Sequence, residues 1–135
     1  MAEAQKEMSK NIISTSLVKE AFEDKVKSLS KNMLIIKFGA EWCAPCNMIK
    51  KQWLENVEAI KNSGKDIEFV DIDVDDEMEL YGFLKTKKML VGIPTILAYY
   101  ENKKDNTHWW IPEKSFSGRD KSELQIFFDE CAKQL

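Results

Sequence analysis

Two cysteines separated by two residues precede a helical pattern, and this short stretch constrains the chain more than any other. It reads EWCAPC over residues 41–46, and the apolar residues after it recur at the spacing of one helix face, at Ile49, Trp53, Val57 and Ile60. Pro45 suits the first turn of a helix, because a residue there gives up no intrahelical hydrogen bond. We therefore expect the cysteine pair to open a helix that packs against a core.

The placement of the two thiols favours thiol–disulfide chemistry. A thiolate is the reactive form of cysteine, and the N–H groups and dipole at a helix N-terminus stabilise a negative charge. Cys43 is placed there, and Cys46, one turn further on, can reach a mixed disulfide formed on Cys43. We predict that Cys43 attacks and Cys46 resolves. Trp42 would add an apolar surface beside the attacking sulfur, and Ala44 is small enough for a substrate chain to approach.

The rest of the chain alternates helical and strand patterns. We expect helices at 16–29, from the cysteine pair onward, at 78–84 and behind Asp120, and strands at 33–38, 67–74, 95–100 and 108–116. If the adjacent Trp109 and Trp110 lie on the last of these strands, their side chains point to opposite faces, so that at most one joins the core and the other is either exposed or folded onto the hairpin. This order predicts the α/β class, with a mixed central β-sheet flanked by helices on both faces.

Length and composition indicate a single ordinary domain. The 135 residues suffice for one core, and we expect a flexible N-terminal segment at 1–11 and one domain over 12–135. A net charge of −3 lacks the basic excess of a nucleic-acid-binding protein, and the apolar runs are too short to span a membrane or to form a signal peptide. Three cysteines are too few for a secreted disulfide framework, and their odd number favours a reducing compartment. We therefore expect a cytoplasmic protein without nucleic-acid or membrane partners.

Three motifs taken together resemble the thioredoxin family: AEWCAPC at 40–46, GIPT at 92–95, and the Ser-Gly pair at 117–118 before the last helix. The resemblance extends over residues 12–134 and implies the thioredoxin fold, with Cys43 as the exposed nucleophile and Cys46 as the resolving thiol. It also implies a cis peptide bond before Pro94, on the segment that faces the sulfurs. The residues that would then contact a substrate are Trp42, Ala44, Pro45, Gly92, Ile93, Pro94 and Gly118.

The resemblance implies a thiol:disulfide oxidoreductase that reduces disulfides in protein substrates. Its electrons would come from a donor of the thioredoxin-reductase type, and no bound cofactor is implied. Two alternatives stay open. The protein could be a disulfide oxidase or isomerase, because the dipeptide Ala44-Pro45 does not fix the direction of exchange. It could also be a binding module whose groove around Trp42 and Pro94 holds a partner, although such a module has no need of both cysteines.

One charged pair departs from the family pattern. Lys37 stands where family members carry a buried aspartate that relays the proton of the resolving cysteine, and Asp71 stands where they carry its lysine partner. On neighbouring strands the two side chains would share one face and tolerate burial together. We interpret them as a swapped pair in which Asp71 is the candidate proton acceptor for Cys46. Alternatively, both charges reach solvent at the sheet edge and only hold the local fold.

Three further departures concern helices and loops. Lys51 replaces a second proline of the family pattern, which predicts a straighter helix. The segment before GIPT is longer by about four residues and contains a basic run at 85–88. The hairpin between Pro94 and Gly118 is longer by about eight residues and holds His108.

A structural zinc site is the main alternative use of the cysteines, because Cys43, Cys46, His108 and Cys131 would form a Cys₃His set. However, the neighbouring proline and tryptophan have no use in zinc binding, and Cys131 lies on an apolar helix stripe where a buried thiol is ordinary. The acidic run VDIDVDDE lacks the glycine and glutamate that a calcium loop requires at its positions. We therefore expect no metal site.

Overall fold

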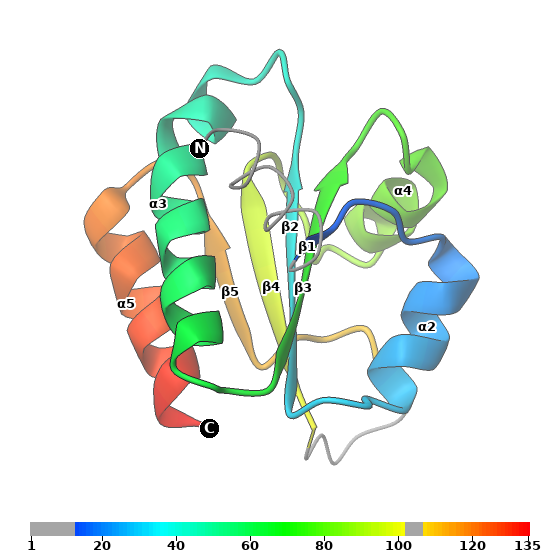
Figure 1. The fold of residues 1–135 in the computed structure, drawn as a ribbon. Helices are drawn as coiled ribbons and strands as arrows, with labels where there is room; N and C mark the ends of the chain where they lie inside the picture. Colours follow the sequence, from blue (N-terminus) through cyan, green and yellow to red (C-terminus); the bar gives the residue numbers. More distant parts are fainter. Residues whose placement is uncertain (1–12, 102–106) are drawn as a thin grey trace.

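A five-stranded mixed sheet forms the centre of the protein in the computed structural model, which describes residues 13–101 and 107–135 (Figure 1). The strands, in the order β1-β3-β2-β4-β5 across the sheet, are β1 (Ile13–Ser14), β2 (Met33–Gly39), β3 (Ile67–Asp73), β4 (Thr95–Tyr100) and β5 (Lys114–Ser117). β1 and β2 run parallel to β3, whereas β4 runs antiparallel to β2 and β5. The predicted flexible segment 1–11 lies outside the described residues, as does most of the ENKKDN turn.

Helices cover both faces of this sheet. They are α2 (Lys19–Lys27), α3 (Ala44–Asn62), α4 (Met78–Thr86) and α5 (Lys121–Lys133). α3 and α5 lie on one face and α2 and α4 on the other (Figure 1). The predicted fold class is thereby confirmed. Among the described residues, no helix combines the length and apolar character that a membrane crossing needs.

Strand β2 explains why the sheet needs two helical layers. All seven of its residues are buried, and its side chains divide between two core clusters. Met33 and Ile35 pack in the cluster that includes residues of α3 and α5, while Leu34 and Ile36 pack in the cluster that includes residues of α2 and α4. A strand covered on both faces requires a continuous apolar run, and the sequence MLIIKF provides one with a single exception, Lys37.

The topology brings three loops together at one end of the central strands. β2 ends at Gly39 opposite Asp73, the last residue of the parallel strand β3. β4 runs in the opposite direction, so its first residue, Thr95, pairs with Phe38 near the same end. The loop that leads into α3, the loop after β3 and the segment before β4 therefore meet where the two cysteines lie.

The predicted strand at 108–116 is wrong over its first six residues. The strand begins only at Lys114, and residues 107–110 form turns. Pro112 has no N–H group to give to a sheet, which disfavours an earlier start. Smaller differences concern α2, which begins at Lys19 rather than at residue 16, and β1, whose two residues are too few to give a sequence pattern.

The two tryptophans before β5 do not divide between opposite faces as predicted. Trp109 is buried, and its ring stacks on Phe83 at a centroid distance of 5.6 Å and packs against Phe22 at the same distance. Trp110 is half-buried and meets the edge of Phe83, with Lys87 Nζ 4.3 Å from its ring centroid. Because Trp109 packs against residues of α2 and α4 and Trp110 against Phe83 of α4, the long hairpin extends the core on that side of the sheet.

We expect Trp109→Ala to lower the free energy of unfolding by about 3–5 kcal/mol, because it opens a large cavity among aromatic rings. Trp110→Ala should cost less, since its ring is already partly in water. Urea denaturation at a constant m-value measures both changes. Ile126→Ala, at an exposed apolar position on α5, serves as the matched control and should change stability by no more than about 0.5 kcal/mol. A larger loss for Trp110→Ala than for Trp109→Ala would contradict this account of the hairpin.

Candidate active site

Cys43 and Cys46 form a disulfide at the N-terminus of α3, with their Cα atoms 5.2 Å apart. Cys43 is the N-cap residue, and its Sγ accepts a hydrogen bond from the Cys46 N–H at 3.2 Å. Pro45 occupies the first turn as predicted. Within the described helix α3, the first turn holds no acidic residue, so no carboxylate opposes a thiolate there. The helix terminus is thus arranged to stabilise a negative charge on Cys43.

The two sulfurs face different surroundings. Cys43 Sγ lies 3.8 Å from the carbonyl oxygen of Ile93, whose peptide bond to Pro94 is cis, as expected. Cys46 instead lines a cavity between α3 and the sheet. Cys43 was expected on an exposed rim, but in the disulfide it is only 5% exposed, against 4% for Cys46. The surroundings, and not the exposed area, therefore distinguish the two cysteines.

The predicted substrate-contacting residues gather around Cys43. Trp42 is 69% exposed, and its indole N–H donates to Asp75 Oδ2 at 2.8 Å. Next to Cys43 in the chain, Ala44 is exposed and Pro45 is half-buried. Opposite them, the Gly118 N–H donates to the Pro94 carbonyl at 3.1 Å, and Gly118 has a φ of +104°, a conformation that favours glycine.

The segment with Gly92, Ile93 and Pro94 is held in place at both of its ends. The Thr95 hydroxyl donates to the Gly92 carbonyl at 2.7 Å and lies 3.0 Å from the Ser117 hydroxyl. Together with the hydrogen bond from the Gly118 N–H to the Pro94 carbonyl, these contacts fix the cis-proline segment to the end of β5. The surface around Cys43 is therefore built by three segments far apart in the sequence.

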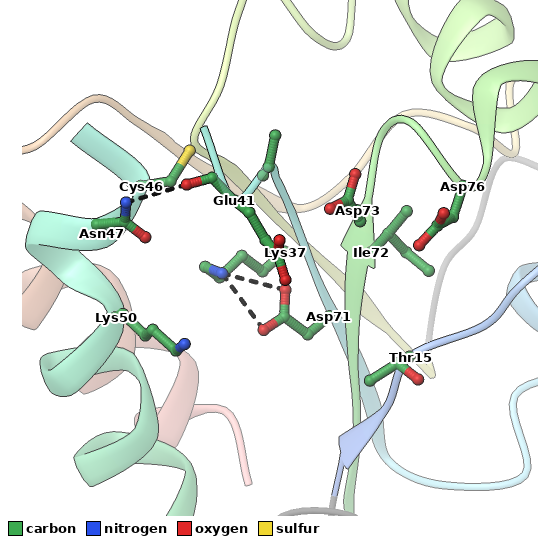
Figure 2. Close-up of a pocket in the computed structure, with 12 residues that line it drawn as sticks. Thr15, Lys37, Glu41, Cys46, Asn47, Lys50, Asp71, Ile72, Asp73 and Asp76 are labelled. Carbon is green, nitrogen blue, oxygen red and sulfur yellow. Dashed lines mark hydrogen bonds and ion pairs between the residues drawn. The ribbon is translucent and has the colours of Figure 1, made fainter. Parts of the chain in front are cut away.

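The cavity beside Cys46 contains the charged pair that the sequence indicated. Its volume is about 280 Å³, and its lining includes Lys37, Gly39, Cys46, Lys50, Asp71 and Asp76 (Figure 2). Lys37 and Asp71 occupy paired positions on β2 and β3, and Lys37 Nζ lies 3.1 and 3.3 Å from the two carboxylate oxygens. The Lys37 side chain is 8% exposed and that of Asp71 29%.

This geometry contradicts the alternative in which both charges reach solvent at the sheet edge. β2 and β3 are interior strands, and Lys37 is buried between the sheet and α3, with its Nζ 5.8 Å from the Trp53 ring centroid. Asp71 is the member of the pair that water can reach, from the cavity side. The predicted placement on neighbouring strands and one face is therefore confirmed, while the chemical roles of the pair stay predictions.

Two residues near the disulfide were not identified from the sequence. Asp75, which anchors Trp42, follows β3, and the carboxyl ends of neighbouring parallel strands are where binding sites gather in α/β sheets. The pairing of the last residues of β2 and β3 could have revealed it. Gly39 is the other: a Cβ there would lie 3.3 Å from Cys46 Sγ and 3.7 Å from Lys37 Nζ. Glycine keeps the space between the sulfur and the ammonium open.

The four residues of the zinc alternative do not converge. His108 packs edge-on against Trp110, whereas Cys131 is buried in the core cluster that includes residues of α3 and α5. In residues 13–101 and 107–135, no three side chains of the types His, Cys, Asp and Glu lie close enough together to hold a metal ion. Burial raises the pKa of the Cys131 thiol to about 12, so this third cysteine stays protonated at neutral pH.

Comparison with known proteins identifies the family. The family model described as Thioredoxin matches residues 13–128. The chain belongs to the thioredoxin family. Thioredoxin of Gallus gallus is 30% identical over 104 residues, which cover 77% of this chain and 84% of that protein. Thioredoxin of Mus musculus is 28% identical over 114 residues, covering 84% and 93%.

Solved thioredoxin structures share the fold. The structure of Trichomonas vaginalis thioredoxin superposes with a TM-score of 0.64 at 21% identity, covering 89% of this chain and 96% of that one. Oxidised mitochondrial thioredoxin 3 of Saccharomyces cerevisiae gives 0.62 at 21% identity, covering 87% and 94%. The expected thioredoxin fold is confirmed. Family membership and the disulfide between Cys43 and Cys46 together make the protein a thiol–disulfide oxidoreductase.

In the reduced protein, we expect Cys43 to be alkylated first at mildly acidic pH. Its position as N-cap should bring its pKa below the value of about 8.5 for a free thiol, while Cys131 stays protonated. Mass spectrometry of the labelled peptides after a short exposure measures the order. Cys43→Ser serves as the control and should remove the fast label only. Faster labelling of Cys46 or Cys131 than of Cys43 would contradict the assignment of the nucleophile.

Proposed function

We propose that this protein reduces disulfides in other proteins through a cycle between its Cys43–Cys46 disulfide and the dithiol. The observation that carries the proposal is the division of the two sulfurs between two surroundings. Cys43 faces a partly exposed surface formed by Trp42 and the segment at 92–94, and Cys46 faces a cavity with an ion pair. One side suits a substrate chain and the other suits proton transfer.

The substrate would bind as an extended segment across the cis-proline. The Cys43 sulfur lies 3.8 Å from the Ile93 carbonyl oxygen. A substrate disulfide placed at Cys43 therefore brings the substrate backbone beside the backbone of Ile93. Pairing of backbone groups in this way is a form of strand addition, which is tolerant of substrate sequence. Trp42, fixed by Asp75, would cover one side of the segment, and Gly92 and Gly118 leave room on the other.

The exchange proceeds in two balanced steps. The Cys43 thiolate attacks one sulfur of the substrate disulfide, which forms a mixed disulfide and releases the other substrate sulfur as a thiolate that takes up a proton. Cys46 then loses its proton and attacks the Cys43 sulfur, which forms the Cys43–Cys46 disulfide and releases the second substrate sulfur as a thiolate that takes up a proton. Two electrons pass from the dithiol to the substrate, and a dithiol donor of the thioredoxin-reductase type returns them by the reverse exchange.

Asp71 would accept the proton of Cys46 through water in the cavity. Its carboxylate and the Cys46 sulfur line the same space, and its partly exposed side chain can pass the proton on to solvent. Lys37 would hold the carboxylate in place by its two contacts. The odd number of cysteines supports a reducing compartment such as the cytoplasm, which stays a prediction for this chain.

Turnover of a protein disulfide substrate with a reductase-type donor tests the function. The intact protein should reduce the substrate catalytically, Cys43→Ser should abolish turnover, and Cys46→Ser should accumulate a mixed disulfide on Cys43. If the protein instead oxidises substrate dithiols in a glutathione buffer and reduces none, the oxidase alternative holds. Partner capture that is equally strong in Cys43→Ser and in the intact protein, without turnover, would favour the binding module.

The proton role of Asp71 gives a separate prediction. Asp71→Asn should slow the resolving step by at least about tenfold, seen as a longer-lived mixed disulfide on Cys43 in quenched-flow samples. Asp76→Asn is the matched control, because Asp76 lines the same cavity but is exposed, and it should leave the rate unchanged. Both variants must be folded under the conditions used, because a broken buried ion pair also destabilises. Resolution at the normal rate in folded Asp71→Asn would leave solvent as the proton acceptor.

A further inference from the structure

A positive charge lies close to the resolving sulfur. The position of a Cβ on Gly39 is 3.3 Å from Cys46 Sγ and 3.7 Å from Lys37 Nζ, so the sulfur and the ammonium are within about 7 Å of each other. Because Gly39 has no side chain, no protein atom from this position stands between them.

The surroundings strengthen the effect of this charge. Lys37 is buried against Trp53 and the sheet, and charges separated from bulk water interact more strongly than charges on the surface. Lys50 lines the same cavity on α3, but it is exposed, so water and salt screen its ammonium. The two lysines thus differ in burial while they share one cavity (Figure 2).

We propose that Lys37 stabilises the thiolate of Cys46 and thereby raises the reduction potential of the Cys43–Cys46 pair. Reduction adds two electrons and up to two protons to the neutral disulfide, and the reduced pair carries negative charge at Cys46 once this thiol has passed its proton to Asp71 through water. A fixed positive charge beside this sulfur stabilises the negatively charged reduced state. It does not stabilise the disulfide in the same way, because the disulfide is neutral. An aspartate at position 37 would act in the opposite sense, because a carboxylate beside the sulfur disfavours its thiolate.

This inference rests on the proposed function and narrows its substrates. A couple with a raised potential reduces only those disulfides whose own potential is higher still. Strained or exposed disulfides have such potentials and are the labile, regulatory or catalytic ones, whereas buried structural disulfides have low potentials. Lys37 therefore restricts the protein to easily reduced disulfides through its effect on the reduction potential, without touching the substrate.

Equilibration of the full-length protein with glutathione buffers of stated composition tests the inference, with dithiol and disulfide quantified after acid quenching and alkylation. Lys37→Met should shift the equilibrium toward the disulfide by about tenfold, equivalent to about 30 mV. Asp71→Asn should shift it in the opposite direction, because the ammonium loses its counter-charge. The opposite signs separate an electrostatic effect from destabilisation, since both variants break the same ion pair.

Two controls complete the design. Lys37→Arg keeps the charge and should retain the equilibrium within about twofold, and Lys50→Met should do the same because its charge is screened. If Lys37→Met does not fold, Asp71→Asn alone decides the test: a shift toward the dithiol supports the inference, and no shift or a shift toward the disulfide overturns it.

An equilibrium that moves less than twofold in folded Lys37→Met, or that moves toward the dithiol, overturns the inference. Shifts of the same sign in Lys37→Met and Asp71→Asn overturn it as well. The measurement uses glutathione alone, so it does not depend on turnover of a protein substrate. Failure of the proposed function in the turnover assay and failure of this inference can therefore be told apart.

Discussion

The burial of β2 on both faces is the constraint on which the rest of the structure depends. A strand without a solvent face needs a helix layer on each side, and the helix that follows β2 directly, α3, begins at the edge where β2 and β3 both end. Cys43 caps that helix, and Cys46 lies in its first turn. Their place at a helix terminus, beside the amino end of the antiparallel β4, thus follows from how the sheet is covered. The pairing of β2 with β3 and β4 in turn holds the three loops next to one another.

Lys37 is the one charge on this otherwise apolar strand, and its burial costs free energy unless Asp71 stays opposite it. Breaking a buried pair of this kind typically costs about 3–5 kcal/mol, whereas an apolar pair of similar volume is often tolerated. The pair is therefore poorly explained by stability alone. Its position in the cavity of the resolving sulfur gives it a chemical context that a second isoleucine could not provide.

The sequence was sufficient for the central strands and the site, and it failed where tertiary packing overrides local pattern. β2, β3 and β4 have strong apolar runs, and the cysteine pair with the GIPT segment identifies which ends of them meet. By contrast, the aromatic stretch before β5 reads as a strand because of its composition, yet Trp109 packs into Phe22 and Phe83 instead. Gly39 and Asp75 act through neighbours on other strands, which no single stretch reveals.

The separation of the two sulfurs has a consequence for how this protein can change. In the proposed function, residues around Cys43 contact the substrate segment, and residues of the cavity accommodate a proton and a charge at Cys46. Because the two groups of residues lie on different sides of the disulfide, the binding surface can vary without a change in the electrostatics of the couple. The long hairpin fits this division, since its aromatic rings pack against α2 and α4, on the face of the sheet opposite Lys37 and Asp71. Sequence changes in the hairpin would therefore alter the stability of the protein, whereas the charge at position 37 would alter the reduction potential of the cysteine pair.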